Sequence, residues 1–202
     1  DLSLQPVEKL AKEIKTQYGV PAAGYAVDIT NENEVEANTK VILEKFKKID
    51  ALLNNAANNP KVENQVGKNF SRLENFPLEV WNADVAVGLT GAFLCAKHYG
   101  ISISNNPDGG VILNISSDLG LIAPDQRLYR LPGLPEDQQP VKPVTYSVVK
   151  TGLIGLTRYL VTYWPDLVIR RNALCPGGVE AGQSPEFIKE VNSRISMGRL
   201  AQ

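Results

Sequence analysis

The segment Tyr146-Ser-Val-Val-Lys150 places a phenol and an ammonium group four residues apart. If the segment is helical, both side chains lie on one face of the helix, one turn apart. A neighbouring ammonium favours the phenolate and so brings the pKa of a tyrosine toward the range useful for acid and base catalysis. The same spacing is also typical of a solvated helix face, so other segments must decide between the two interpretations.

Apolar residues alternate between helical spacing and short continuous runs along the chain. Helical spacing predicts helices at 6–18, 32–48, 77–104, 145–164 and 185–194. Short apolar runs predict strands at 22–27, 49–53, 111–115 and 167–174. This alternation favours an α/β fold with a doubly wound parallel sheet, covered by helices on both faces. The 202 residues contain no repeat and no linker composition, so we expect a single domain.

Polar residues follow each of the four predicted strands. They are Asp28, Asn54 and Asn55, Ser116 and Ser117, and Cys175. Taken singly, each is explained as a helix cap or a turn former. Taken together, they occupy the carboxyl ends of the strands, which is where open α/β sheets bind their ligands.

Composition argues against several classes of protein. The formal net charge of −1 provides no basic surface for nucleic acid, and we expect no membrane partner, since no apolar run approaches the length needed to span a bilayer. The single histidine, His98, and two distant cysteines, Cys95 and Cys175, predict no metal site. The free cysteines and the absence of a visible secretory signal favour a reducing, cytoplasmic location.

Five segments together resemble the short-chain dehydrogenase/reductase family, in its compact single-domain branch. They are Asp28-Ile-Thr30, Asn54-Asn-Ala-Ala57, Asn114-Ile-Ser-Ser117, Tyr146-Ser-Val-Val-Lys150 and Arg171-Asn-Ala-Leu-Cys-Pro-Gly-Gly178. They occur in the order of the family and span nearly the whole chain. The resemblance implies a Rossmann-like fold and hydride transfer between a nicotinamide cofactor and a hydroxyl or ketone substrate.

The resemblance assigns the catalytic roles to three residues. Tyr146 would exchange a proton with the substrate oxygen, and Lys150 would assist it and hold the nicotinamide ribose. Ser117 would hydrogen-bond the substrate oxygen, which provides a fixed donor before charge develops there.

The resemblance also assigns cofactor-binding residues. They are Asp1, Asp28, Ile29, Asn55, Ala56, Ala57, Tyr146, Lys150, Pro176, Gly177 and Val179. Asp1 precedes Asp28 by 27 positions, the place of a family acid that accepts from the ribose 2′-hydroxyl and repels a 2′-phosphate. We therefore expect NAD as the preferred cofactor, with NADP as the alternative.

The family places a glycine-rich turn before Asp1 and a last helix and strand after Gln202. We therefore expect the domain formed by 1–202 to be incomplete at both ends, without its first βαβ segment and its last strand. A rearranged sheet is the alternative. A non-catalytic fragment or pseudoenzyme retained for interaction is the alternative to a working oxidoreductase.

Gly88 lies where the family usually has an asparagine that bends the helix and holds a water of the proton relay. Glycine has no side chain to bond that water, so we expect a slowed relay, restored by Gly88→Asn.

The segment between Ser117 and Tyr146 is longer than is usual in the family. Within it, Arg127 and Arg130 can bind a phosphate or carboxylate, or else pair with Glu136 and Asp137. Similar insertions occur in members encoded with bacterial surface-sugar or flagellin-glycosylation genes, which suggests a sugar derivative as substrate. The resemblance further implies a homodimer or homotetramer.

Overall fold

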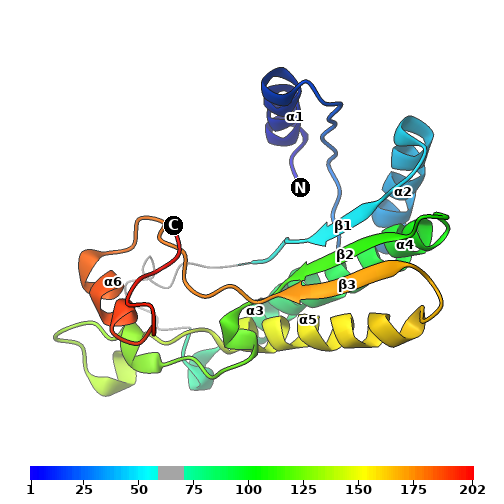
Figure 1. The fold of residues 1–202 in the computed structure, drawn as a ribbon. Helices are drawn as coiled ribbons and strands as arrows, with labels where there is room; N and C mark the ends of the chain where they lie inside the picture. The colour runs from blue at the N-terminus through cyan, green and yellow to red at the C-terminus, as the bar shows by residue number, and fades with distance from the viewer. Residues whose placement is uncertain (59–70) are drawn as a thin grey trace.

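The computed structural model describes residues 1–58 and 71–202 (Figure 1). The helices are α1 (Leu4–Tyr18), α2 (Glu32–Phe46), α3 (Leu78–Val85), α4 (Gly91–Ser104), α5 (Val144–Tyr163) and α6 (Pro185–Asn192). A π-helical turn, η3 (Ala86–Thr90), joins α3 to α4. Short 3-10 turns are η2 (Leu73–Asn75), η4 (Asp118–Gly120), η5 (Gln126–Tyr129) and η6 (Glu136–Gln138). Each predicted helix is therefore present, with ends shifted by a few residues.

Three strands form a parallel sheet in the order β1 (Ala51–Asn54), β2 (Gly110–Ile115) and β3 (Ile169–Leu174). Leu52 pairs with Ile112, and Asn114 pairs with Ala173. The helical connections return the chain to the same end of the sheet each time, so all three strands end at one edge. The predicted α/β fold with a parallel sheet is confirmed.

The predicted strand at 22–27 is absent. This segment is extended between α1 and α2, but it pairs with none of the three strands in the described part of the chain (Figure 1). Its backbone hydrogen bond runs from the Val27 N–H to the Asp1 carbonyl, at 2.8 Å. An apolar run becomes a strand only when a neighbouring strand satisfies its backbone, and none adjoins it here.

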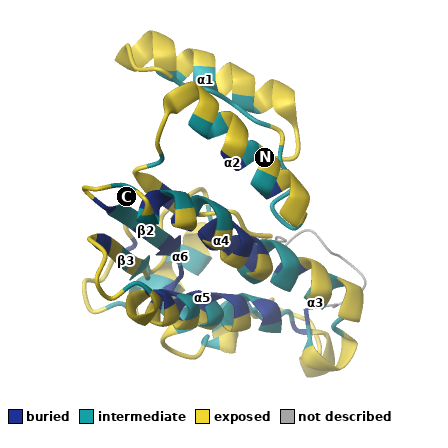
Figure 2. Cartoon of the chain, turned by 90° about the vertical axis from the view of Figure 1, so that its right-hand side faces the viewer, coloured by how far each residue is buried: buried dark blue, intermediate teal, exposed yellow. Residues whose placement is uncertain are grey.

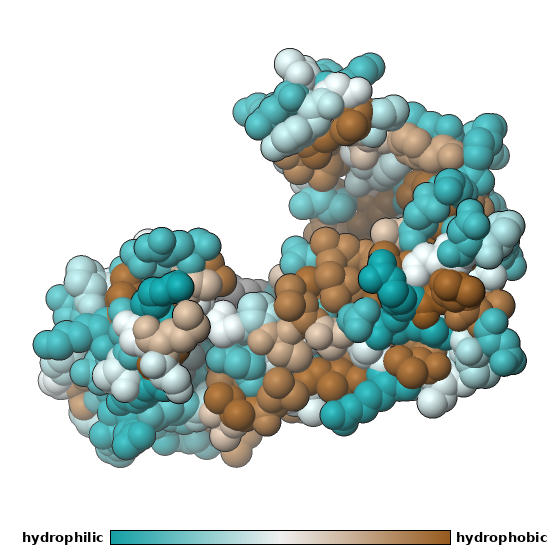
Figure 3. Space-filling view, in the orientation of Figure 1, coloured by the Kyte–Doolittle hydropathy of each residue, from teal (hydrophilic) through white to brown (hydrophobic). Residues whose placement is uncertain are grey.

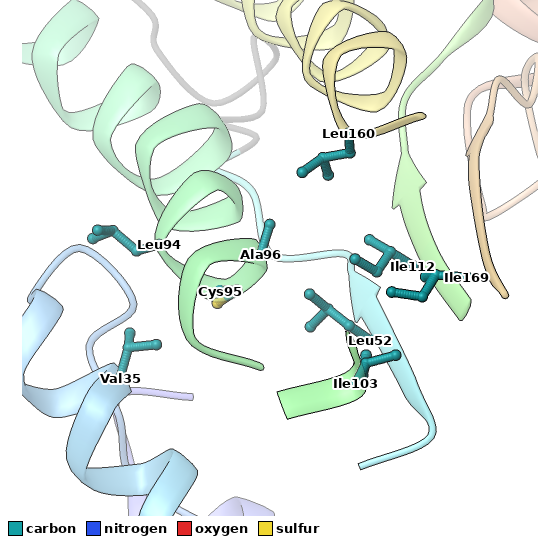
Figure 4. Packing of buried hydrophobic residues seen from close by; sticks show 9 residues of the cluster. All are labelled: Val35, Leu52, Leu94, Cys95, Ala96, Ile103, Ile112, Leu160 and Ile169. Atoms are coloured by element: carbon teal, nitrogen blue, oxygen red, sulfur yellow. The ribbon is translucent and has the colours of Figure 1, made fainter. Parts of the chain in front are cut away.

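The core lies between one face of the sheet and the helices α4 and α5. Its buried side chains come from all three strands and from α2, α4 and α5, and are Val35, Leu52, Leu94, Cys95, Ala96, Ile103, Ile112, Leu160 and Ile169 (Figure 4). Burial raises the pKa of the Cys95 thiol to about 11, so this cysteine behaves as a small apolar core residue. The core fixes α4 and also α5, which is the helix that contains Tyr146.

The opposite face of the sheet is open within the described residues. Leu53 on β1 and Leu174 on β3 are 59% and 51% exposed. Figure 3 shows hydrophobic surface below a hollow under α1, and Figure 2 shows α1 itself largely exposed. Alternate residues of a strand face opposite sides, so the buried set and the exposed set belong to the two faces. The expectation that helices cover both faces is met on one face only.

The sequence analysis expected no segment long and apolar enough to span a bilayer, but the helix from Leu78 to Ser104 passes that test. It has 27 residues, and an 18-residue window within it reaches a mean hydropathy of 1.2, so length and composition alone would let it cross a membrane. Its α4 part packs on β1 and β2 through Leu94 and Ala96, which are buried. The apolar composition is therefore explained by its place in the core.

Candidate active site

Three hydrogen bonds join α5 to the carboxyl end of β2 and to the turn η4 that follows it. The Lys150 Nζ donates to the Ile115 carbonyl at 2.8 Å, and the Ser116 hydroxyl donates to the Lys150 carbonyl at 2.7 Å. The Thr151 hydroxyl donates to the Gly120 carbonyl at 3.1 Å. The side chain of Lys150 is thereby fixed where the sheet ends, which is where open α/β sheets bind their ligands.

Gly120 permits this close approach of η4 to α5. A Cβ at this position would lie 2.8 Å from the Ser116 Oγ and 2.9 Å from the Lys150 carbonyl. Any other residue would push the turn away from the helix and weaken the bond between Ser116 and Lys150.

Tyr146 and Lys150 line one small cavity of about 20 Å³. Its lining residues are Ala57, Asn58, Asp84, Gly88, Lys142, Pro143, Thr145, Tyr146, Val149 and Lys150. Lys150 is 7% exposed, and this burial lowers the pKa of its ammonium. Its Nζ lies 5.7 Å from the centre of the Tyr146 ring. The structure therefore brings the predicted phenol and ammonium to one cavity.

A second ammonium group approaches the same phenol. The Lys142 Nζ lies 3.7 Å from the centre of the Tyr146 ring, a favourable position for a cation over an aromatic face. Burial lowers the pKa of Lys142, the charge of Lys150 lowers it further, and the charge of Asp118 opposes both. Two ammonium groups, those of Lys142 and Lys150, thus lie near the Tyr146 ring.

Ser117 follows β2 and is buried, but its hydroxyl is bonded locally. It donates to the Asp118 Oδ1 at 2.8 Å and accepts from the Leu119 N–H at 3.2 Å. Ser117 does not line the cavity that Tyr146 and Lys150 share. The structure therefore does not bring all three predicted catalytic side chains together, and the role of Ser117 stays a prediction.

A chain of buried polar side chains holds the strand ends in place. The Asn54 amide donates to the Asn114 Oδ1 at 2.8 Å, and the Asn114 amide donates to the Thr157 hydroxyl at 2.8 Å. Asn54 also donates to the Ala92 carbonyl of α4 at 3.4 Å. β1, β2, α4 and α5 are thus connected beneath the site.

Asp84 is a buried carboxylate that faces the cavity from α3. It is 7% exposed, and its Oδ2 accepts from the Thr145 hydroxyl at 2.5 Å. Thr145 immediately precedes Tyr146, so this bond joins α3 to the start of α5. The sequence analysis gave no role to Asp84, Thr145 or Lys142. The available signal was a carboxylate one turn before Gly88 in a largely apolar helix.

Gly88 lies in the π-helical turn η3, and helical bulges of this kind are frequent at functional sites. A Cβ at Gly88 would lie 2.5 Å from the Val149 Cγ1. A side chain at position 88 therefore requires Val149 to shift, and the restored relay expected of Gly88→Asn stays a prediction.

The predicted adenosine-side residues lie beyond β1 and before α2. Asn55, Ala56 and Ala57 are exposed. The Asp28 Oδ1 accepts from the Thr30 hydroxyl at 2.7 Å and the Thr30 N–H at 2.9 Å, and these bonds lower the pKa of Asp28.

Two other predicted residues adjoin this region. Ile29 packs against Gly91, where an added Cβ would lie 2.7 Å from its Cδ1. Asp1 is next to Val27 through the backbone bond described above.

The predicted nicotinamide-side residues follow β3. The Pro176 carbonyl accepts from the Asp118 N–H at 3.0 Å, which joins this loop to η4. Gly177 lies beside the Asp118 carboxylate, and Val179 forms an isolated bridge with Ala201. These residues therefore lie at the same edge of the sheet as Ser117.

The insertion between η4 and α5 pairs its own charges. Arg127 forms two hydrogen bonds of 2.8 Å to Asp125, and Arg130 contacts Glu136 at 2.5 Å. The anion-binding role considered for Arg127 and Arg130 is therefore not favoured. Of the expected carboxylate partners, Glu136 is used by Arg130, while Arg127 uses Asp125.

The insertion also contacts α6 and the region of Tyr146. Arg194 donates to the Asp125 Oδ2 at 3.0 Å, and the Tyr129 and Phe187 rings lie 6.1 Å apart. Burial first, and then the charges of Tyr146 and Asp118, raise the pKa of Tyr129 to about 12. The insertion thus stands between α6 and the cavity.

Gln139 closes the far part of the insertion. Its amide nitrogen donates to the Leu131 carbonyl at 3.1 Å and the Leu134 carbonyl at 2.7 Å, and its oxygen accepts from the Leu131 N–H at 2.8 Å. It is 8% exposed, so these bonds are made away from water.

Within the described residues, no group of three or more His, Cys, Asp or Glu side chains is arranged to hold a metal ion.

Comparison with known proteins gives a consistent result. A family model described as short chain dehydrogenase matches residues 1–129. An uncharacterized oxidoreductase of Thermotoga maritima is 32% identical over 212 residues, covering 100% of this chain and 73% of that protein. The NADP-dependent mannitol dehydrogenase of Alternaria alternata is 29% identical over 200 residues, covering 96% of this chain and 65% of that protein. The crystal structure of an NAD+-bound xylitol dehydrogenase has a similar fold, with a TM-score of 0.80 at 21% identity, covering 100% of this chain and 75% of that one.

Proposed function

The chain belongs to the short-chain dehydrogenase family, and on that basis we propose that the protein is an oxidoreductase that transfers a hydride between a nicotinamide cofactor and a hydroxyl or ketone substrate. The observation that supports this most directly is the shared cavity of Tyr146 and Lys150 at the carboxyl edge of the sheet. A phenol and a buried ammonium at that place have the chemistry needed to move a proton to or from a substrate oxygen.

The residues present fit a nicotinamide dinucleotide. Lys150 uses its Nζ for one bond, to Ile115, which leaves N–H groups for ribose hydroxyls. Asp28 accepts both of its bonds on Oδ1, which leaves Oδ2 for a donor of the adenine side. The bound nicotinamide would supply the hydride donor or acceptor.

The chain's own residues would handle the proton. In alcohol oxidation, Tyr146 Oη accepts the substrate hydroxyl proton, and in ketone reduction it donates a proton to the substrate oxygen. The Lys150 ammonium stabilises negative charge on that phenol. Ser117 would donate to the substrate oxygen after its hydroxyl turns away from Asp118.

A neutral sugar alcohol is the substrate class that we propose. The Alternaria relative is named for mannitol, a sugar alcohol. Arg127 and Arg130 of the insertion pair with carboxylates, so these two arginines do not favour a phosphorylated or nucleotide-linked sugar. A polyol requires only the polar groups around the cavity and the insertion.

NAD is the cofactor that we propose as preferred. Asp1 lies against Val27, close to Asp28, where a carboxylate would repel the 2′-phosphate of NADP. The Alternaria relative is NADP-dependent, so the ratio of kcat/KM for the two cofactors decides the point. Asp1→Ser should shift that ratio toward NADP, and an unchanged ratio would remove Asp1 from the argument.

A homo-oligomer of dimer or tetramer size is also proposed. Large apolar side chains on the outer faces of α4 and α5 support it: Phe93, Ile101, Val148, Tyr159, Val161 and Tyr163 are each at least 39% exposed. Light scattering after size-exclusion chromatography tests it, and a monomer at micromolar concentration would contradict it.

The catalytic proposal is tested with the purified protein and a panel of sugar alcohols and sugar phosphates. We expect cofactor reduction with a neutral polyol. Tyr146→Phe should lower kcat/KM by about 100-fold or more, while nicotinamide fluorescence still reports cofactor binding. Full activity of Tyr146→Phe would overturn the proposal. Cofactor binding without turnover of any carbonyl or alcohol would instead favour the non-catalytic alternative.

A further inference from the structure

Asp84 and Gly88 occupy successive turns of the same helix and face the same cavity. Gly88 contributes no side chain, and the Val149 Cγ1 fills the space in which one would stand. Among the side chains that α3 and η3 present to the cavity, the polar one is therefore the Asp84 carboxylate. Its Oδ2 is bonded to Thr145, while its Oδ1 has no hydrogen-bond partner among residues 1–58 and 71–202.

The cavity has the size and lining that a single ordered water needs. Its volume of about 20 Å³ exceeds the roughly 10–15 Å³ that one water requires. Asp84 and Lys150 provide an acceptor and a donor on its wall, and no direct ion pair joins them in the described part of the chain. A water there would have polar partners on both sides.

We propose that Asp84, through a water in this cavity, is the proton acceptor that connects the Tyr146–Lys150 pair with solvent. This inference rests on the proposed function. In this proposal the group that handles the proton is the Asp84 carboxylate, one helical turn before position 88, and not the amide of an asparagine at position 88.

The proton balance is simple. During alcohol oxidation the Tyr146–Lys150 pair gains one proton from the substrate hydroxyl. The Lys150 ammonium gives one proton to the water, and the water gives one to the Asp84 carboxylate. The carboxylic acid then releases the proton to solvent, which restores the carboxylate. In ketone reduction the same steps run in reverse.

Asp84 also has a structural role, since it anchors Thr145 next to Tyr146. Asp84→Asn separates the two roles, because the amide oxygen still accepts from the Thr145 hydroxyl but no longer takes up a proton. Glu79→Gln is the matched control. Glu79 is an exposed carboxylate on the same helix, and its substitution removes the same charge.

The experiment measures kcat and KM for polyol oxidation as a function of pH and of imidazole concentration. We expect Asp84→Asn to lower kcat by about 10-fold to 100-fold, within the range of general acid and base effects, with KM changed less than about two-fold. Added imidazole should partly restore kcat by accepting the proton. Glu79→Gln should match the wild-type protein in all of these.

Two results would overturn the proposal. One is a wild-type kcat for Asp84→Asn under conditions in which Tyr146→Phe is inactive, since the proposed function would then stand without this relay. The other is a loss of kcat that imidazole does not change and that parallels a fall in the unfolding temperature, which would leave only the anchor role.

A readout independent of turnover is a high-resolution crystal structure of the protein. A water within about 3.2 Å of both the Asp84 carboxylate and the Lys150 Nζ would support the proposal. A dry cavity, or an Asp84 carboxylate bonded only to protein, would overturn it.

Discussion

Val149 fills the space that a side chain at Gly88 would need, since a Cβ on Gly88 would lie 2.5 Å from the Val149 Cγ1. The two residues therefore form a complementary pair across η3 and α5. The small residue and the branched residue must be exchanged together. The effect of having glycine at position 88, where the family usually has asparagine, therefore depends on the residue at position 149 as well.

Gly88→Asn is expected to destabilise the protein by about 1–3 kcal/mol, because the added side chain overpacks against Val149. Combined with Val149→Ala, the same substitution should cost less than the sum of the two single changes. Urea unfolding of both single variants and the double variant gives the coupling. A coupling below about 0.5 kcal/mol would contradict the steric pairing.

Asn114→Ala is expected to lower the free energy of unfolding by about 3 kcal/mol. Asn114 is fully buried, and its loss leaves the Asn54 amide without its acceptor at β2 and the Thr157 hydroxyl without its donor. Chemical denaturation measures the change. Asn172→Ala, at an exposed position of β3, is the control and should stay within about 0.5 kcal/mol of the wild-type protein. Equal losses of unfolding free energy for Asn114→Ala and Asn172→Ala would show that the hydrogen bonds from Asn54 to Asn114 and from Asn114 to Thr157 do not stabilise the fold.

Asp125→Asn is expected to loosen the attachment of α6 to the insertion at neutral pH. Hydrogen bonds from Arg127, followed by Arg194, hold the pKa of Asp125 well below its usual range. A carboxylate with a depressed pKa stabilises the fold above its unfolded pKa of about 4 and loses that effect as the pH falls toward the folded value. The difference between variant and wild type should therefore be largest at pH 7 and shrink in acid.

Amide hydrogen exchange in η5 and α6 is the measurement for Asp125. Asp137→Asn, in the exposed turn η6, removes the same charge and should leave the exchange unchanged. Equal exchange rates for Asp125→Asn and Asp137→Asn at neutral pH would refute the role of Asp125.

Lys142→Met is expected to raise the unfolding temperature at pH 7. Burial lowers the pKa of Lys142, followed by repulsion from Lys150, so the folded state disfavours the charged form. This penalty is complete below the folded pKa and disappears as the pH rises through the interval up to the unfolded value of about 10.4. The gain in unfolding temperature should therefore decline toward pH 10.

Lys48→Met is the comparison variant, because the pKa of Lys48 is shifted in the opposite direction to that of Lys142. A hydrogen bond to Asp50 raises the pKa of the exposed Lys48, so removing its charge should give no gain at neutral pH. Should Lys142→Met lower the unfolding temperature instead, the contact of its ammonium with the Tyr146 ring would outweigh its burial.

The sequence was sufficient to predict the elements that make their own contacts. Helical periodicity predicted α5 and the helix from Leu78 to Ser104, and the strand-end rule placed Ser116 and Ser117 at the end of β2. The segment at 22–27 shows the limit, because an apolar run is a strand only beside a partner strand, and adjacency is a tertiary property.

In the site, too, some residues could be predicted from the sequence and others could not. Helical spacing places Tyr146 and Lys150 on one face of α5, whereas Asp84 reaches the cavity through the packing of α3 against α5, and Lys142 through the path of a proline-rich loop. Contacts between segments so far apart in sequence have no local periodic signal. For the same reason, the contact between Gly88 and Val149 could not be predicted from the sequence.

The closure made by Gln139 has a consequence for how such enzymes diversify. Since one buried amide satisfies three backbone groups at Leu131 and Leu134, the shape of the far part of the insertion is largely encoded within its own sequence. Exposed positions of this segment can therefore change while Gln139 keeps its shape, provided that Arg194 still holds Asp125 and Arg72 still donates to the Glu136 carbonyl.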